Sequence, residues 1–221
     1  MTGSRPLEAC VAPPAAAALA RLAHVRQVAR GDTILFEGLA NQACVSVAAG
    51  VLRASKATED GREAIVGLHF AGDFVGRPFA AQAAFSLSAA TDAELRSYSR
   101  PAVETLLREQ PDIAHELYRR ALDEIDNMHG WMLVLGRQVA GEKIGSFLLH
   151  LARRFDAAES FDLPLTRAEI GDVLGLTIGT VSRELAALRR AGLIDTPGQR
   201  GLVICNRAAL AARTGLASAF V

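Results

Sequence analysis

The chain has 221 residues, half of them hydrophobic, which is enough to bury one large or two modest cores. Its 24 basic and 24 acidic side chains give no net charge, so charge alone supports a nucleic-acid partner only weakly. Three widely spaced cysteines argue against a disulfide framework and a tetrahedral metal site. No apolar run reaches the roughly 18 residues of a spanning helix, so we expect a cytoplasmic protein with no membrane partner.

Residues 1–28 predict a loose arm followed by a helix, and strands are expected from about Arg30. From there to about residue 100, short β-rich runs alternate with Gly-Asp, Ala-Gly and Asp-Gly turn signals. Short strands at this spacing predict an antiparallel roll or barrel. The first expected domain, residues 1–110, is therefore a β-roll with flanking helices.

A long helix is predicted from Pro111, because proline is favoured in the first turn of a helix. Its apolar residues recur every three or four positions, which predicts a coiled-coil seam, a core helix packed on the roll, or both. The seam consists of Ile113, Leu117, Ala121, Ile125, Met128, Met132, Leu135 and Val139. Three further apolar residues are expected on the opposite face, namely Tyr118, Leu122 and Trp131. We expect the chain to form a homodimer through residues 111–137, and we expect the helix to be broken at Gly141.

Residues 166–192 predict two short helices joined by Gly175, the pattern of a helix-turn-helix. Thr166 and Glu169 have the spacing of a capping box, and Thr177 is a natural N-cap for the second helix. The second helix is expected to bury Val181, Leu185 and Leu188. A helical hairpin with solvated arginines is the alternative reading of this stretch.

The other face of the second helix suits the major groove of DNA, because Arg183 can donate twice to guanine O6 and N7. Two short apolar runs at residues 193–194 and 202–204 flank the loop TPGQRG and predict a wing. Arg200 in this loop is expected to contact phosphate, which adds affinity without reading sequence. Residues 138–221 are therefore predicted to form a winged helix-turn-helix domain.

A β-roll, a long helix and a winged helix in this order resemble the CRP/FNR family of bacterial transcription regulators over nearly the whole chain. The resemblance rests on LPLTRAEIGDVLGLTIGTVSRELAALRRAGLI and LGRQVAGEKIGSFLLHLARR, while VGLHFAGDFVGRP and WMLVLGR are similar to FNR-type regulators of the FnrL branch. It implies an α+β fold with a cyclic-nucleotide-binding-like, double-stranded β-helix roll. It also implies a homodimeric activator without enzymatic activity, which binds a near-palindromic DNA operator and RNA polymerase.

The resemblance also assigns roles to single residues of the helix-turn-helix. Arg183 would read a guanine, and Ser182 and Thr180 would contact bases or phosphate nearby. Thr166, Arg167 and Thr177 would contact phosphates. The family usually has glutamate where this chain has Gly179, and glycine cannot accept a hydrogen bond from cytosine N4. We therefore expect a relaxed or shifted base preference opposite Gly179.

The residues that would receive a signal depart from the better-known family members. Alignment of GDFVGRP and LSA with a CRP-type pocket puts Arg77 at the position of the ribose-binding glutamate and Leu87 at that of the phosphate-binding arginine. A buried phosphate beside leucine would keep its charge uncompensated, so cyclic AMP is not expected. Three cysteines cannot supply the four thiolates of an FNR-type iron–sulfur cluster, which is not expected either.

Two alternatives remain open from the sequence. Haem would make the chain a sensor of nitric oxide, carbon monoxide or redox state, with His69 as a weak candidate ligand beside His24 and Cys44. A cupin-like metal enzyme would need about three clustered ligands, of which the predicted roll offers a single histidine, His69. We therefore predict neither a cofactor nor a metal.

Overall fold

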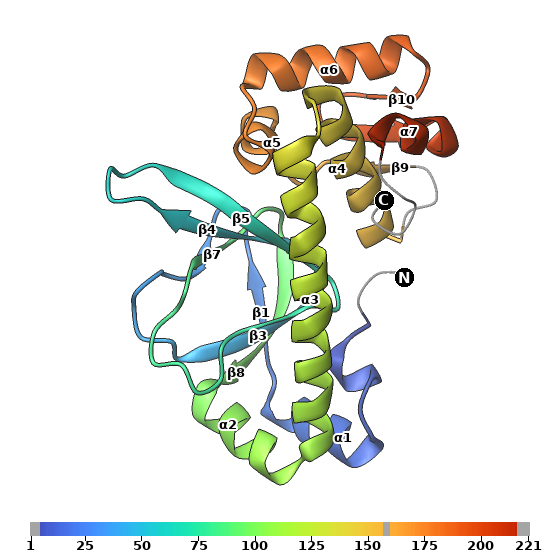
Figure 1. Ribbon diagram of the computed structural model, residues 1–221. Helices are drawn as coiled ribbons and strands as arrows, with labels where there is room; N and C mark the ends of the chain where they lie inside the picture. Colours follow the sequence, from blue (N-terminus) through green and yellow to red (C-terminus); the bar gives the residue numbers. More distant parts are fainter. Residues whose placement is uncertain (1–4, 157–159, 216–221) are drawn as a thin grey trace. The chain divides into compact units, whose positions relative to one another are not determined.

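A computed structural model of the chain describes residues 5–156 and 160–215 (Figure 1). The fold is α+β, as predicted, and it divides into two compact units, one reaching Leu122 and the other beginning at Asp123. The division falls inside the long helix, so each half of that helix packs within a different unit. None of the helices in the described ranges is long and apolar enough to span a membrane.

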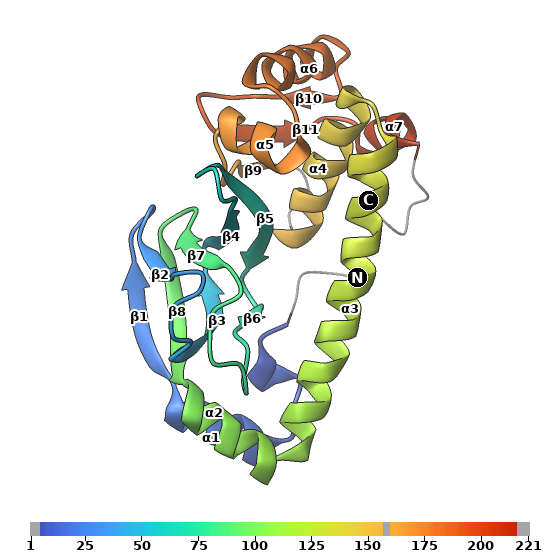
Figure 2. The ribbon, with the colours of Figure 1, turned by 60° about the vertical axis from the view of Figure 1, so that its left-hand side comes forward.

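The amino-terminal unit is a roll of two antiparallel four-stranded sheets, which confirms the predicted architecture (Figure 2). One sheet has the order β1-β8-β3-β6 and the other the order β2-β7-β4-β5. The strands are β1 (His24–Val28), β2 (Thr33–Leu35), β3 (Ala43–Ala49), β4 (Val51–Ala57), β5 (Glu63–Phe70), β6 (Phe74–Val75), β7 (Ser86–Ala89) and β8 (Ala93–Ser99).

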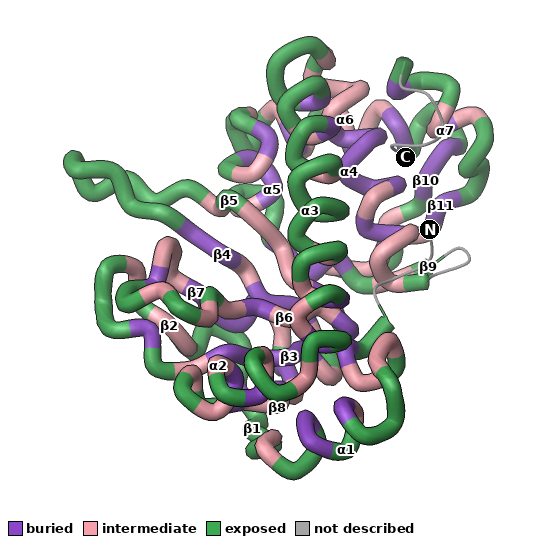
Figure 3. The backbone as a smooth tube through the Cα atoms, turned by 60° about the horizontal axis from the view of Figure 1, so that its bottom comes forward, coloured by how far each residue is buried: buried purple, intermediate pink, exposed green. Residues whose placement is uncertain are grey.

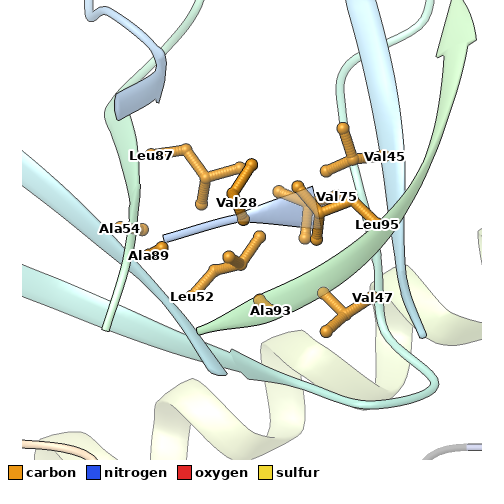
Figure 4. Close-up of a cluster of buried hydrophobic side chains, with 10 residues drawn as sticks. All are labelled: Val28, Val45, Val47, Leu52, Ala54, Val75, Leu87, Ala89, Ala93 and Leu95. Atoms are coloured by element: carbon orange, nitrogen blue, oxygen red, sulfur yellow. The ribbon is translucent and has the colours of Figure 1, made fainter. Parts of the chain in front are cut away.

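Aliphatic side chains from both sheets fill the interior of the roll, where they point toward one another (Figure 4). Leu52, Leu87 and Leu95 are each 0% exposed. Their burial stabilises the roll by roughly 25 cal/mol for each Å² of apolar surface removed from water. The centre of the roll is therefore a packed core.

The first strand begins earlier than the sequence predicts. β1 starts at His24, so the expectation of strands from about Arg30 is wrong. Only Val28 of this strand is buried, because β1 lies at the edge of its sheet and pairs with β8 alone. Without an alternating apolar pattern, the strand had no local signal. Before it come a short 3₁₀ turn (Leu7–Ala9) and α1 (Pro13–Leu22), consistent with the predicted helix.

After the roll, α2 (Arg100–Glu109) leads into the long helix α3 (Pro111–Arg137), which begins at the predicted proline. Glu116 accepts hydrogen bonds from Arg119 at 2.8 Å and from Arg120 at 2.7 Å. Arg120 also donates to the carbonyl of Gly72, between β5 and β6, at 2.9 Å. These bonds fix the first turns of α3 on the roll.

The predicted seam of α3 divides into two parts. Ile113 is buried and Leu117 is half-buried in the cluster formed by the roll and its helices. Farther along, α3 is largely exposed (Figure 3). Within the second unit, α3 exposes five large apolar side chains that lie on one side of the helix, and we call them the α3 stripe. They are Ile125 (43% exposed), Met128 (52%), Met132 (70%), Leu133 (51%) and Leu135 (43%).

Four predicted positions in and around the seam differ from one another in the structure. Tyr118 and Leu122, expected on an opposite face, are 64% and 44% exposed like the stripe. Trp131 instead packs edge-on against Phe147 of α4, with ring centroids 6.3 Å apart. Val139 lies beyond the end of α3 and precedes the next helix.

The carboxyl-terminal unit contains the second half of α3 and a winged helix-turn-helix. Its helices are α4 (Ala140–Arg154), α5 (Arg167–Leu174), α6 (Ile178–Arg190) and α7 (Arg207–Thr214). β10 (Ile194–Asp195) pairs with β11 (Gly201–Ile204), which confirms the two predicted strands of the wing. A third strand, β9 (Ser160–Asp162), pairs with β11 and was not predicted, because three largely exposed residues carry no apolar alternation.

The predicted helix break at Gly141 is wrong, because Gly141 is the second residue of α4. The chain leaves α3 at Arg137, and the carboxylate of Glu142 accepts the backbone N–H of Val139 at 3.0 Å to cap α4. A Cβ at Gly141 would lie 2.9 Å from the carboxylate of Glu184 on α6. That atom is the far end of a flexible side chain, so a Cβ at position 141 would require only that Glu184 shift its carboxylate.

The ion pairs at the start of α3 predict a pH-dependent contribution to stability. Hydrogen bonds from Arg119 and then Arg120 lower the pKa of Glu116 from 4.5 to about 2. A carboxylate whose pKa is lower in the folded state stabilises the fold above its unfolded pKa and loses that contribution as pH falls toward the folded pKa. Glu116→Gln should lower the free energy of unfolding by about 2 kcal/mol at neutral pH.

Urea titrations at pH 7 and at about pH 3 would measure this effect, because the difference between wild type and variant should narrow between the two pH values. Glu109→Gln, at the exposed end of α2, is the control and should change little. A difference of the same size at both pH values would contradict the proposed role of the Glu116 carboxylate.

Candidate nucleic-acid interface

The first helix of the helix-turn-helix begins at the predicted capping box. The hydroxyl of Thr166 accepts the N–H of Glu169 at 3.2 Å, and the Glu169 carboxylate accepts the N–H of Thr166 at 2.7 Å. Gly175 ends α5 with a φ of 63°, a left-handed conformation that glycine adopts without strain. A Cβ at Gly171 would lie 2.6 Å from the carbonyl of Leu176, so this glycine, not singled out from the sequence, lets the turn pack on α5.

The second helix, α6, buries one face and exposes the other. Thr177 caps it by accepting the N–H of Thr180 at 3.1 Å, as predicted. The predicted inner residues Val181, Leu185 and Leu188 are 0%, 3% and 2% exposed. With 3.6 residues per turn, their burial directs the residues between them outward. α6 lies at the edge of its unit, with α5 and β10 beside it (Figures 1 and 2).

Polar side chains on the outward side of α6 are linked by hydrogen bonds. The hydroxyls of Thr177 and Thr180 lie 3.0 Å apart, and the exposed Arg183 donates to the Thr180 hydroxyl at 3.2 Å. Arg167, from the first turn of α5, donates to the hydroxyl of Ser182 at 3.4 Å. We call this surface the α6 face. It comprises Thr166, Arg167, Thr177, Gly179, Thr180, Ser182 and Arg183.

Packing does not require a glycine at position 179. It is exposed in the first turn of α6, and the nearest atom that an added Cβ would meet is the Thr177 hydroxyl, at 3.9 Å. Its φ is not among the positive values seen at other glycines of the chain. The fold therefore admits a side chain at this position of the α6 face.

Arg200 lies in the wing loop but is engaged within its own unit. Its guanidinium donates to the carbonyls of Leu163 and Pro164 at 3.4 and 3.5 Å, and its carbonyl accepts the N–H of Leu163 at 2.8 Å. These long side-chain bonds hold the wing against the segment before α5. The phosphate contact expected of Arg200 remains a prediction.

The roll positions that correspond to a cyclic-nucleotide site differ in character from such a site. Arg77 is exposed, and Leu87 is 0% exposed within the core of the roll (Figure 4). The buried amide of Asn41 donates to the carbonyls of Arg77 and Ala80 at 2.8 and 3.3 Å, which holds the loop after β6 in place. These residues offer neither a carboxylate for a ribose nor a buried cation for a phosphate.

The candidate haem ligands lie on different strands. His69, on β5, stacks on Phe85 with ring centroids 6.2 Å apart. Cys44 lies on β3 in the other sheet, and burial raises its pKa to about 11, which disfavours the thiolate form that binds iron. His24 is exposed at the start of β1. Over residues 5–156 and 160–215, no three or more His, Cys, Asp or Glu side chains gather as a metal site would require.

A β-roll joined by a long helix to a winged helix-turn-helix defines a class of DNA-binding regulators, and comparisons with known proteins agree. Residues 25–110 match the model of the cyclic nucleotide-binding domain, and residues 142–213 match that of the Crp-like helix-turn-helix domain. The transcriptional activator protein FnrL of Cereibacter sphaeroides is 37% identical over 90% of this chain and 84% of its own length. A probable transcriptional activator of Rhizobium leguminosarum bv. viciae is 40% identical over 81% of this chain and 76% of its own.

Among solved structures, FixK2 from Bradyrhizobium japonicum aligns with a TM-score of 0.82 and 31% identity, over 89% of this chain and 99% of that one. The chain therefore belongs to the CRP/FNR family, as its motifs predicted. It carries the DNA-binding helix-turn-helix domain of that family and is a transcription regulator rather than an enzyme.

The open position at Gly179 generates a specificity prediction. Gly179→Glu should restore a hydrogen-bond acceptor for cytosine and sharpen the preference at one base pair by about 5- to 150-fold, equivalent to roughly 1–3 kcal/mol. Competition gel shifts with duplexes varied one base pair at a time would measure this preference for wild type and variant.

Gly179→Ala is the matched control, because it adds a Cβ in open space without an acceptor. It should leave the base preference of the wild type unchanged. Equal sharpening by alanine and glutamate, or no sharpening by glutamate, would show that this position does not face the bases.

Proposed function

We propose that the chain is a cytoplasmic, sequence-specific transcriptional activator that binds a near-palindromic DNA operator as a homodimer and acts on RNA polymerase. The observation that carries the proposal is the α6 face, where an exposed arginine stands on a helix whose other side is buried. Two similar proteins are named as transcriptional activators, which supports activation over repression.

The positions of the residues on the α6 face suggest which of them contact bases and which contact phosphates. Arg183 would read a guanine in the major groove, with Ser182 and Thr180 contacting bases or phosphate beside it. Thr166, Arg167 and Thr177 would contact phosphates, since Thr166 and Thr177 cap the amino-terminal ends of α5 and α6. Helix amino-terminal ends attract phosphate through their free N–H groups and their dipoles. Arg200 would add a phosphate contact from the wing.

The α3 stripe supports a second copy of this chain as the dimer partner. Its five members are at least 43% exposed, although four of them, Ile125, Met128, Met132 and Leu135, repeat every three or four residues as core positions do. A large exposed apolar surface rimmed by polar residues marks an interaction site. Two-fold pairing through α3 would present two recognition helices to half-sites about 34 to 36 Å apart.

We further propose that DNA binding requires neither a cyclic nucleotide nor an iron–sulfur cluster. The buried Leu87, the exposed Arg77 and the loop bonded to Asn41 do not fit a ribose phosphate. The three cysteines of the chain are fewer than the four thiolates that one cluster needs. In the haem-sensing alternative, His69, which stacks on Phe85, would be the candidate ligand.

Sequence reading by Arg183 is tested by comparing specific and scrambled duplexes. Arg183→Ala should lose about 5- to 150-fold of preference at one guanine and bind scrambled DNA nearly as well as wild type does. Arg200→Ala should weaken binding to every duplex and reduce the slope of log affinity against log salt by about one. Gel shifts over a range of salt concentrations separate the two roles. Equal losses on both duplexes for Arg183→Ala would contradict base reading.

Dimerisation through the α3 stripe is tested with a charge. Met132→Glu would place two carboxylates in an apolar interface and should convert the dimer to a monomer at micromolar concentration, as read by sedimentation equilibrium. Val25→Glu is the matched control, because Val25 is 66% exposed on the edge strand β1 and Met132 is 70% exposed. A dimer that persists in Met132→Glu would exclude this face as the interface.

A further inference from the structure

The connection between α3 and α4 consists of two residues, Gln138 and Val139. The side-chain oxygen of Gln138 accepts the hydroxyl of Ser146, on α4, at 2.9 Å. Its side-chain nitrogen donates to the backbone carbonyl of Thr214, the last residue of α7. One amide therefore joins the end of α3 to two helices of the DNA-binding domain, and we call these two bonds the Gln138 clamp.

Both partners of the clamp are buried, since Ser146 is 3% and Thr214 is 1% exposed. The carbonyl of Thr214 belongs to the last turn of α7, where helix carbonyls lack partners within the helix. A buried carbonyl or hydroxyl without a partner costs about 1–3 kcal/mol. Gln138 therefore provides a hydrogen-bond partner for a buried hydroxyl and for the buried end of α7.

A glycine on α4 lets α7 pack beside the Gln138 clamp. A Cβ at Gly145 of α4 would lie 3.2 Å from the methyl group of Thr214 and 3.5 Å from a methyl group of Leu210. The hydroxyl of Thr214 donates to the carbonyl of Ala211 at 2.8 Å, which sets the Thr214 side chain. α4 and α7 therefore pack closely at the point where Gln138 reaches them.

Apolar contacts support the same junction from α3. Trp131 packs edge-on against Phe147 and His150 of α4, with centroids 6.3 and 5.2 Å apart, and Val134 is 3% exposed. Such contacts hold two helices together but allow small rotations, because dispersion attraction has little directionality. Hydrogen bonds depend strongly on angle, so the Gln138 clamp restricts the angle of α3 against α4 and α7.

We propose that Gln138 is a positioning residue for DNA binding, which sets the direction of α3 against α4 and α7 so that both recognition helices of a dimer meet their half-sites together. This inference rests on the proposed homodimer. When one recognition helix of a dimer is bound, binding of the second depends on the effective concentration of that second helix at the other half-site. Loss of the clamp lowers that effective concentration, whereas the contacts within one half-site stay unchanged.

Gln138→Leu removes both bonds at similar volume, and Gln138→Glu keeps the acceptor for Ser146 but cannot donate to Thr214. Affinities of the full-length protein would be measured for a duplex carrying the inverted repeat, for the same repeat with its spacing lengthened by one base pair, and for a single half-site. Gln82→Leu, at an exposed position of the roll, is the control.

Both Gln138 variants should bind the inverted repeat about tenfold more weakly, bind the single half-site as wild type does, and discriminate less against the altered spacing. An unchanged affinity for the repeat would overturn the proposal. Equal losses on the repeat and the half-site would overturn it too, because they indicate a general loss of stability. Ser146→Ala, which removes one bond of the clamp, gives the same readouts if the Gln138 variants do not fold.

A different result is expected if the protein does not bind DNA as a dimer. Wild-type protein would then bind the repeat no more tightly than the single half-site, before any variant is compared. A wild-type preference for the repeat together with insensitive Gln138 variants would refute the clamp and preserve the dimer.

Discussion

The functional surface of this protein depends on how α6 divides its residues between the core and water. Val181, Leu185 and Leu188 occupy one side of the helix and are almost fully buried, so Thr180 and Arg183 must face outward. Capping adds a second constraint, because Thr166 and Thr177 fix where α5 and α6 begin. The turn at Gly175 then brings Arg167 and Ser182, from different helices, within hydrogen-bond distance.

The long helix α3 is fixed at its two ends by the same kind of contact. Within the amino-terminal unit, Arg120 donates to the backbone carbonyl of Gly72 in the roll. Within the carboxyl-terminal unit, Gln138 donates to the backbone carbonyl of Thr214. Between these contacts α3 exposes apolar side chains that its own chain does not cover. A helix held at both ends and apolar between them is suited to pairing with its copy, which is the basis of the proposed dimer.

The parts of the fold that were predicted correctly carry local signals. The capping box at Thr166, the left-handed Gly175 and the buried spacing in α6 all lie within 25 residues or so of one another, where propensity and periodicity act. The strands β1 and β9 were missed because they are largely exposed and form by pairing with distant strands. The break predicted at Gly141 is wrong because α4 is capped before the glycine, where the Glu142 carboxylate accepts the N–H of Val139.

The candidate site shows the same limit. The residues of the α6 face could be predicted from the sequence. The bond between Arg167 and Ser182 and the bond from Arg200 to Leu163 could not, because each joins residues that only the folded chain brings together. Gln138 and Asn41 carried no signal, because the carbonyls that they bind lie 76 and 36 residues away in the chain. Hydrogen bonds from one side chain to a distant backbone leave no periodic pattern.

The central claim is that two copies of this chain present their α6 faces together to one duplex. Selecting and sequencing bound fragments from a random duplex pool, with purified protein and no added effector, tests it most directly. The account predicts an inverted repeat whose half-site centres are about 10 to 10.5 base pairs apart. Enrichment of a single unrepeated motif, or of no motif, would contradict it.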